Sequence, residues 1–268
     1  MHSGTPRLQV IGGGRMGEAL LTGLLRHGWA DAPELAVVEK LADRAAQLKE
    51  AFPGVTVAAE PGASEGHVLA VKPGDIDGAC RALAATGSPA PVLSIAAGVT
   101  LDRLEAALAA GTPVVRAMPN TPALVGAGAA AIAPGHAAGE GHLAWAEGIL
   151  GAVGTVVRVA EPLLDAVTGL SGSGPAYVFL VAEAMTEGGV LAGLPRPVAG
   201  ALAVQTLLGS ARLLAESGEG PEALRAAVTS PGGTTAAGLR ALEAAGVRSA
   251  FLEAIVAATD RSRALGRA

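Results

Sequence analysis

The chain has 268 residues, half of them hydrophobic but only 2% aromatic, and its formal net charge is −5. This length allows two domains or one large one. The single cysteine, Cys80, excludes a disulfide framework, and the absence of a basic stripe argues against nucleic acid and anionic membranes as partners. Residues 1–6 lack the charged and apolar regions of a signal peptide, so we expect a soluble, cytoplasmic protein.

The first predicted element is a short buried strand over residues 7–11, and a glycine-rich turn follows it directly. The turn reads Gly12-Gly13-Gly14-Arg15-Met16-Gly17, and a helical pattern runs over residues 18–25. Strand, Gly-x-Gly-x-x-Gly and helix form the dinucleotide fingerprint: the first glycine makes the turn, the second admits the pyrophosphate, and the third lets helix and strand pack closely. A glycine-rich turn that binds no nucleotide is the alternative.

The second predicted strand, residues 35–38, ends at Glu39 and Lys40, where the ribose of the adenosine half would lie. A carboxylate at this point accepts hydrogen bonds from the ribose hydroxyls of NAD and repels the 2′-phosphate of NADP. A lysine beside it would attract that phosphate. The two signals oppose each other, and either residue could instead be a solvated charge at a strand end.

Strands and helices continue to alternate up to about residue 160. Further strands are predicted at 55–57, 67–71, 91–95, 113–117, 127–133 and 155–159, with helices such as 101–110 and 140–153 between them. The alternation predicts a Rossmann-like, doubly wound parallel sheet. Ligands of such sheets lie at the carboxyl ends of the strands. The wall of the nicotinamide half is therefore expected in three loops: Ala70-Val71-Lys72-Pro73, Ala96-Ala97-Gly98 and Met118-Pro119-Asn120-Thr121-Pro122.

No strand is predicted from residue 161 onward, where the sequence indicates an all-α region. Helices are expected at 163–169, 174–192, 196–217, 221–228, 234–245 and 248–265. We therefore divide the chain into a dinucleotide-binding domain, 1–160, and a helical domain for dimerisation and substrate binding, 161–268. The helical region has few bulky side chains, so it can form only a small hydrophobic core within one chain. We therefore expect it to be stabilised by self-association. Its most apolar run, 176–185, is broken by Glu183 and too short to span a bilayer.

Two stretches of the helical region predict helix N-termini with free backbone N–H groups. In residues 228–235, Pro-Gly-Gly ends one helix, and Thr234 or Thr235 can cap the next; such an end suits a small carboxylate. In residues 170–177, Ser173 is the expected cap and Pro175 an early helical residue. The alternative is a helix corner whose glycines and hydroxyls serve only capping.

Acid–base side chains are scarce in this half of the chain. From Leu143 to Ala268 there is no His, Cys or Lys. His136 and His142 have no neighbouring Cys and no His-x-x-x-His spacing, so no metal site is predicted. A site of this composition is poorly suited to acid or base catalysis at neutral pH.

Several segments closely resemble pyrroline-5-carboxylate reductase. They are residues 165–177 (Asp-Ala-Val-Thr-Gly-Leu-Ser-Gly-Ser-Gly-Pro-Ala-Tyr), residues 229–235 (Thr-Ser-Pro-Gly-Gly-Thr-Thr), and the strand-end loops at 70–73, 96–98 and 116–122. Their order and spacing match along nearly the whole chain, from Leu8 to about Gly266. The resemblance implies reduction of the cyclic imine of 1-pyrroline-5-carboxylate to L-proline by NADPH or NADH, and active sites at the interface of a homodimer or higher oligomer.

The resemblance also assigns residues. The resemblance implies cofactor contacts at Gly12, Gly14, Arg15, Met16, residues 70–73 and residues 96–98. Together with the fingerprint and the strand ends, the expected cofactor set is Ile11, Gly12, Gly13, Gly14, Arg15, Met16, Gly17, Glu39, Lys40, Ala70, Val71, Lys72, Pro73, Ala96, Ala97, Gly98 and Asn120. The implied substrate set comprises Glu161, Ser230, Gly232, Gly233, Thr234 and Thr235, with the Thr235 hydroxyl nearest the imine nitrogen as the catalytic group. Two departures are present. Glu39-Lys40 stands where many members have Ser, Asn or Arg, and Ala227 stands where Asn is frequent.

The chemistry agrees with this resemblance. A ketone needs an acid to protonate the developing alkoxide, whereas an imine can arrive already protonated and then needs only positioning and a carboxylate anchor. Alcohol dehydrogenases are disfavoured because Tyr177 has Val181 where the short-chain group needs lysine, and because the helical region has no lysine for a β-hydroxyacid dehydrogenase. Two alternatives are an NAD(P)-binding sensor without turnover, which turnover assays separate from an enzyme, and a structural dimerisation protein, which leaves the fingerprint unexplained.

Overall fold

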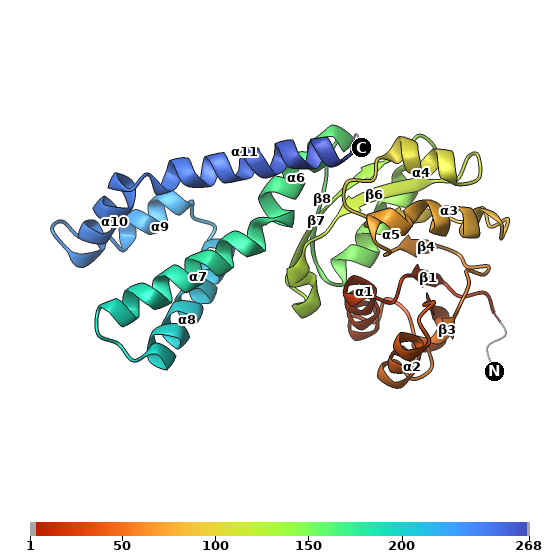
Figure 1. The fold of residues 1–268 in the computed structure, drawn as a ribbon, viewed down its shortest axis with the longest axis horizontal. Coiled ribbons are helices and arrows are strands. Elements are labelled where there is room, and N and C mark those ends of the chain that lie inside the picture. Colours follow the sequence, from red (N-terminus) through yellow and green to blue (C-terminus); the bar gives the residue numbers. More distant parts are fainter. Residues whose placement is uncertain (1–3, 267–268) are drawn as a thin grey trace. The chain divides into compact units, whose positions relative to one another are not determined.

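The computed structural model describes residues 4–266 (Figure 1). Residues 4–173 together with 257–266 form one compact unit, and residues 174–256 form a second. The predicted division at residue 160 follows the last strand, which ends at Arg158, whereas the compact units part at residue 174 and again within the last helix.

The first unit contains one eight-stranded sheet in the order β3-β2-β1-β4-β5-β6-β7-β8. The strands are β1 (Leu8–Ile11), β2 (Leu35–Val38), β3 (Thr56–Ala58), β4 (His67–Leu69), β5 (Val92–Ser94), β6 (Val114–Met118), β7 (Gly128–Pro134) and β8 (Gly154–Arg158). Each predicted strand is confirmed to within two residues. Strands β1, β2, β4 and β5 are buried along their whole length, as expected for parallel strands covered on both faces.

The sheet is not parallel throughout, which corrects the prediction in one detail. Strands β3 to β6 in the sheet order run parallel, but β7 pairs with β6 in the antiparallel sense, and β8 runs parallel to β7. The connection from β6 to β7 spans only residues 119–127 and holds one 3-10 helix, Thr121–Val125. A parallel return needs a crossover of a dozen or more residues, so this strand must come back in the opposite direction.

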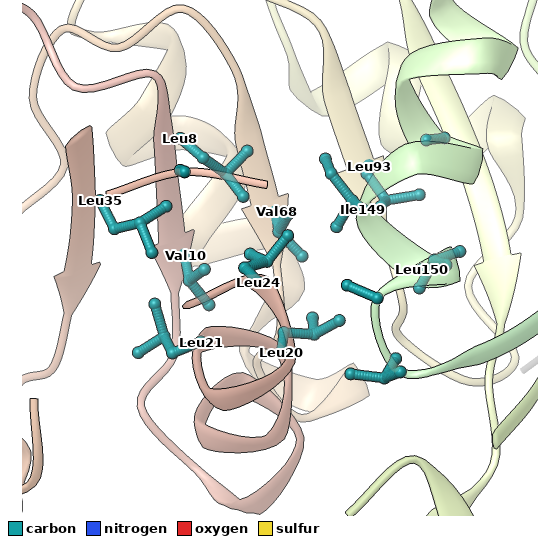
Figure 2. Packing of buried hydrophobic residues seen from close by; sticks show 14 of the residues in the cluster. Leu8, Val10, Leu20, Leu21, Leu24, Leu35, Val68, Leu93, Ile149 and Leu150 are labelled. Atoms are coloured by element: carbon teal, nitrogen blue, oxygen red, sulfur yellow. The ribbon is translucent and has the colours of Figure 1, made fainter. Parts of the chain in front are cut away.

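Helices cover both faces of the sheet and divide the core in two, which is the doubly wound arrangement. Helices α1 (Arg15–Arg26) and α5 (Glu140–Gly151) pack Leu20, Leu21, Leu24, Ile149 and Leu150 against Leu8, Val10 and Val68 of the strands (Figure 2). Helices α3 (Ile76–Ala84) and α4 (Leu101–Ala107) pack Cys80, Leu83 and Leu104 against Ile11 and Leu69 on the other face. Helix α2 (Ala42–Ala51) adds Leu48 to the first cluster.

The described part of the chain after β8 contains no strand, as predicted. It consists of a 3-10 helix (Glu161–Leu163), α6 (Leu164–Val167), a π-helical turn (Thr168–Gly172), α7 (Gly174–Leu191), α8 (Arg196–Glu216), α9 (Pro221–Ala227), α10 (Thr234–Ala244) and α11 (Val247–Gly266). Among the described residues, α8 is the one helix long and apolar enough to cross a membrane by length and composition. Most of its apolar surface is exposed in a single chain.

Candidate functional site

The glycine turn after β1 has the geometry that the fingerprint requires. Gly12 has a φ of +110°, which a residue with a side chain rarely adopts, and a Cβ on it would lie 2.7 Å from the carbonyl oxygen of Ala70. A Cβ on Gly17 would overlap the carbonyl oxygen of Gly12. These two glycines are therefore required by the packing of the protein itself.

Gly14 is different, because nothing in the protein fills the space beside it. It is the N-cap of α1 with φ −69°, and a Cβ placed on it would meet no atom within 4 Å. The first intrahelical hydrogen bond of α1 is donated by Glu18 N–H to Gly14 O. The N–H groups that precede Glu18 in the first turn therefore have no acceptor within the helix. Open space beside a side-chain-free cap at a helix N-terminus fits the pyrophosphate of a dinucleotide.

A cavity of about 630 Å³ opens at this turn. Eight predicted cofactor residues line it: Ile11, Gly12, Gly14, Glu39, Lys40, Ala70, Val71 and Lys72. Ten further residues line it without having been predicted: Val38, Leu41, Pro61, Gly74, Asp75, Asp77, Gly78, Ala79, Arg81 and Ala82. Most of these belong to the segment after β4 and to α3, which carry no recognisable motif. The one sequence feature that could have indicated a cofactor contact is their position after the end of a strand.

Charged side chains of both signs line the cavity. Glu39 turns back on the chain, where its Oε1 accepts a hydrogen bond from Leu41 N–H at 2.9 Å. A Cβ on Gly13 would lie 3.1 Å from Glu39 Oε2 and would overlap Leu48, so Gly13 is needed for packing rather than for the cavity. The Arg103 guanidinium, bonded to both carboxylate oxygens of Asp77 at 3.0 Å, holds the pKa of Asp77 below its usual range.

Arg44, which the sequence did not single out, supports the glycine turn from α2. Its Nε donates to the carbonyl oxygen of Gly13 at 2.8 Å, and its guanidinium forms an ion pair with Glu18 of α1. The turn is thus held between two helices. Arg44 holds the turn through these contacts within the protein, so its role at the site is structural.

Nine predicted cofactor residues do not line the cavity: Gly13, Arg15, Met16, Gly17, Pro73, Ala96, Ala97, Gly98 and Asn120. Asn120 is engaged within the protein, since its Oδ1 accepts from Ala129 N–H at 2.8 Å and its Nδ2 donates to Ser171 O at 3.0 Å. Ala96 is buried, and Gly98 has a φ of +74° in the loop between β5 and α4. These assignments remain expectations.

Glu161 lies in the sheet-containing unit and is bound to it. Its Oε1 accepts a hydrogen bond from Leu101 N–H at 2.7 Å and forms an ion pair with Arg116 Nη1 at 2.8 Å. The Arg116 side chain is only 9% exposed. The expected substrate ligand therefore already has two partners in the protein.

The turn between α9 and α10 lies in the second unit. Gly232 has a φ of +69°, and a Cβ on Gly233 would overlap Ser230 Oγ. Gly233, without a side chain, is the N-cap of α10, so the prediction that Thr234 or Thr235 caps this helix is wrong. Both threonines are exposed first-turn residues, and the first intrahelical bond runs from Ala237 N–H to Gly233 O. The N-cap makes no side-chain hydrogen bond at this end, so the first N–H groups of α10 can bind water or a ligand.

The second predicted helix N-terminus is present, because α7 begins at Gly174, directly after Ser173, and Pro175 is its second residue. Ser173 has helical backbone angles, and its N–H donates to Thr168 O at 2.8 Å, which closes the preceding π-helical turn. The role of Ser173 as the cap of α7 stays a prediction.

Within residues 4–266 one cluster has metal-ligand composition, namely Asp102, Glu105 and His136, whose ligand atoms lie within 4.8 Å of one another. His136 Nδ1 is 2.7 Å from Glu105 Oε2, and its backbone N–H donates to Glu105 Oε1. The hydrogen bond between the His136 ring and the Glu105 carboxylate raises the pKa of His136. An exposed His–Glu pair accounts for the arrangement, so the absence of a metal site remains the prediction.

Comparison with known proteins identifies the family. Residues 161–265 match the family model described as pyrroline-5-carboxylate reductase dimerisation, and residues 7–98 match the one described as NADP oxidoreductase coenzyme F420-dependent. A pyrroline-5-carboxylate reductase of Synechocystis sp. is 47% identical over 97% of this chain and 98% of its own.

Two solved structures agree over the whole length. A pyrroline-5-carboxylate reductase from Coxiella burnetii superposes with a TM-score of 0.92 and 36% identity, covering 98% of this chain and 99% of that one. The Plasmodium falciparum enzyme, solved with NADP bound, gives a TM-score of 0.85 and 27% identity, with 98% and 100% coverage. On this similarity in sequence and fold, the chain belongs to the pyrroline-5-carboxylate reductase family.

Proposed function

We propose that this protein reduces 1-pyrroline-5-carboxylate to L-proline with NADPH or NADH, the last step of proline biosynthesis. The observation that carries the substrate assignment is the N-terminus of α10, which has a glycine cap and no side-chain capping bond. First-turn N–H groups at the positive end of a helix dipole suit the carboxylate of a small substrate. Relatives named for this activity cover nearly the whole chain.

The nicotinamide cofactor supplies the hydride when it is bound. Gly14 and the first turn of α1 would hold its pyrophosphate, because the space beside Gly14 is open and the helix end presents N–H groups. Glu39 and Lys40 would meet the ribose of the adenosine half. The loops at 70–73, 96–98 and Asn120 are proposed to wall the nicotinamide half.

The substrate would be held by the turn between α9 and α10. The backbone N–H groups of this turn, with Ser230 and Thr234, anchor the carboxylate, and the Thr235 hydroxyl lies at the imine nitrogen. Because the imine can bind already protonated, the site needs no strong acid, consistent with the absence of His, Cys and Lys from residues 143–268. Positioning then supplies the main catalytic contribution.

The functional unit would be a homodimer or a larger oligomer in the cytoplasm. The family model matched by residues 161–265 is named for dimerisation, and the helices of this region expose large apolar side chains such as Phe179, Leu180 and Val204. We assign residues 1–160 to cofactor binding and residues 161–268 to dimerisation and substrate binding. Each active site would be shared between two chains.

A steady-state assay tests the proposal directly. The intact protein is mixed with 1-pyrroline-5-carboxylate and either NADH or NADPH, oxidation of the cofactor is followed by absorbance, and proline is measured as the product. We expect proline to form in step with cofactor oxidation, and no oxidation without substrate. Cofactor binding without proline formation under any condition would instead support a nucleotide sensor.

A further inference from the structure

The loop between β5 and α4, residues 95–100, is fixed at both of its ends. Ile95 N–H donates to Leu69 O at 3.1 Å, which ties the start of the loop to the neighbouring strand. At its end, Thr100 is the N-cap of α4 and accepts from Arg103 N–H at 3.4 Å. Between these points lie Ala96–Gly98, which the proposed function places beside the cofactor. The shape of this loop therefore depends on how the start of α4 is held.

The start of α4 is held by a carboxylate from a distant part of the chain. Glu161 lies 60 residues beyond Leu101, and its Oε1 accepts the Leu101 N–H at 2.7 Å. The first N–H groups of a helix have no partner within the helix, so an anion satisfies one of them and also interacts favourably with the helix dipole. Glu161 thus completes the cap that Thr100 begins.

A buried arginine keeps Glu161 in this position. Arg116 projects from the middle of β6, where it pairs in register with Ser94 of β5, and its Nη1 lies 2.8 Å from the same Oε1. Breaking a largely buried ion pair is costly because the remaining charge is left without a partner. The carboxylate is therefore held by a charge as well as by the helix end, both on the β5–β6 side of the sheet.

The other side of the loop rests against the end of the chain. The carbonyl oxygen of Gly98 would lie 3.4 Å from a Cβ on Gly266, and a Cβ on Gly98 would lie 4.0 Å from that of Leu265. These last turns of α11 are fastened by Ser262 Oγ, which donates to Asp165 Oδ1 at 2.6 Å. Residues 161–165 thus hold the loop twice, directly through Glu161 and indirectly through Asp165.

We propose that Glu161 is a positioning residue for the cofactor, acting through the loop 95–100, and not a ligand of the substrate. This inference rests on the proposed function, because it takes Ala96–Gly98 to be cofactor contacts. Both partners of its bonded oxygen belong to the cofactor-binding half of the chain. Loss of Glu161 would release the loop, and the cofactor would then have to order it on binding, which weakens affinity.

The test is an equilibrium titration of the intact protein with NADH and NADPH in the absence of substrate, followed by steady-state kinetics. For Glu161→Ala we expect the cofactor Kd to rise about tenfold, whereas KM for 1-pyrroline-5-carboxylate stays within about twofold. Glu161→Gln retains an oxygen that accepts from Leu101 N–H but loses the ion pair with Arg116, so its cofactor Kd should lie between those of the wild type and Glu161→Ala. Glu147→Gln is the matched control, because it removes a carboxylate of α5 whose ion pair is with Arg158, and it should change neither constant.

The outcomes separate the alternatives. A raised KM for the substrate with an unchanged cofactor Kd would make Glu161 a substrate ligand and overturn the inference, and so would no change in either constant. If Glu161→Ala does not fold, the double variant Glu161→Ala/Arg116→Met takes its place. The second substitution removes the Arg116 guanidinium, which would otherwise be buried without its anionic partner. A wild-type protein that binds cofactor but makes no proline would refute the proposed function alone, because the titration does not depend on turnover.

Discussion

A Cβ on Gly17 would overlap the carbonyl oxygen of Gly12, whereas a Cβ on Gly14, three residues earlier, would have no neighbouring atom within 4 Å. The two glycines of one fingerprint therefore serve different purposes. Gly17 lets α1 pack against the turn after β1. The space beside Gly14 is open, and the proposed function places the cofactor's pyrophosphate there.

This difference predicts opposite effects of two alanine substitutions. Gly14→Ala should leave the free energy of unfolding unchanged or raise it by up to about 1 kcal/mol, because its φ suits alanine. The methyl group would nevertheless occupy the cofactor's space, and the cofactor Kd should rise about 100-fold, or about 2.7 kcal/mol. Gly17→Ala should lower the free energy of unfolding by about 3 kcal/mol through overpacking. Urea denaturation and cofactor titration measure both; unchanged cofactor affinity in Gly14→Ala would contradict the assignment.

Glu39 should set the preference between the two cofactors. Its carboxylate lines the cavity and would repel a 2′-phosphate, so Glu39→Ser is expected to move the ratio of kcat/KM for NADPH over NADH upward by about tenfold. Lys40→Ala, which removes a cation beside it, should move the ratio the other way. A ratio that stays constant in both variants would make these residues ordinary surface charges.

Thr235 should act mainly on the chemical step. Thr235→Val keeps the branched shape, and because Gly233 is the cap, α10 should be little affected. Loss of a hydrogen bond that strengthens as imine becomes amine should lower kcat about 10- to 1000-fold with a moderate change in KM. The control is Thr229→Val, whose hydroxyl donates to the carbonyl oxygen of Arg225 in the last turn of α9 at 2.6 Å. Equal kcat in Thr235→Val and wild type would show that this hydroxyl is structural.

His67 should make the protein less stable in mild acid. It is fully buried at the start of β4, its Nδ1 has no hydrogen-bond partner among the described residues, and burial lowers its pKa to about 4. In the unfolded state the pKa of His67 is about 6.5, so the unfolded state binds a proton before the folded state does as the pH falls. The free energy of unfolding therefore decreases from about pH 6.5 toward about pH 4. The loss attributable to this group should be about 2 kcal/mol between about pH 7 and about pH 5.

The His67 prediction is measured by urea denaturation at several pH values. His67→Leu should remove this part of the pH dependence, while His142→Gln, in a histidine outside the sheet, should keep it. If His67→Leu shows the wild-type slope, other groups determine the acid sensitivity.

The exposed apolar face of α8 should belong to a subunit interface and not to a membrane. Val204 and Leu208 lie one helical turn apart, and both are at least half exposed in a single chain. Sedimentation without detergent at micromolar concentration should show a dimer or a larger assembly. The double variant Val204→Glu/Leu208→Glu should dissociate it and lose activity, whereas Val157→Glu, on the exposed strand β8, should not. A fully active monomer, or a protein recovered only with detergent, would contradict this prediction.

Local patterns were sufficient for much of the fold. All eight strands were predicted to within two residues. For β1, β2, β4 and β5 the signal was strong because buried parallel strands are continuous apolar runs between turn residues. The glycine fingerprint located the cofactor turn, since φ above zero at Gly12 and close packing at Gly17 can be met only by glycine. The all-α region followed from helical periodicity and the absence of β-rich runs.

Tertiary structure alone decided how distant residues meet. The Glu161 carboxylate contacts Leu101 and Arg116, which lie 60 and 45 residues away in the sequence. Residues of α3 line the cofactor cavity although they carry no motif. Such long-range contacts could not be predicted, because they produce no pattern in the spacing of neighbouring residues. The cap of α10 was also predicted at the wrong residue, because it is Gly233 and not Thr234 or Thr235. Glycine and threonine both favour helix starts, so the choice between neighbouring residues depends on the backbone angles that the surrounding packing imposes.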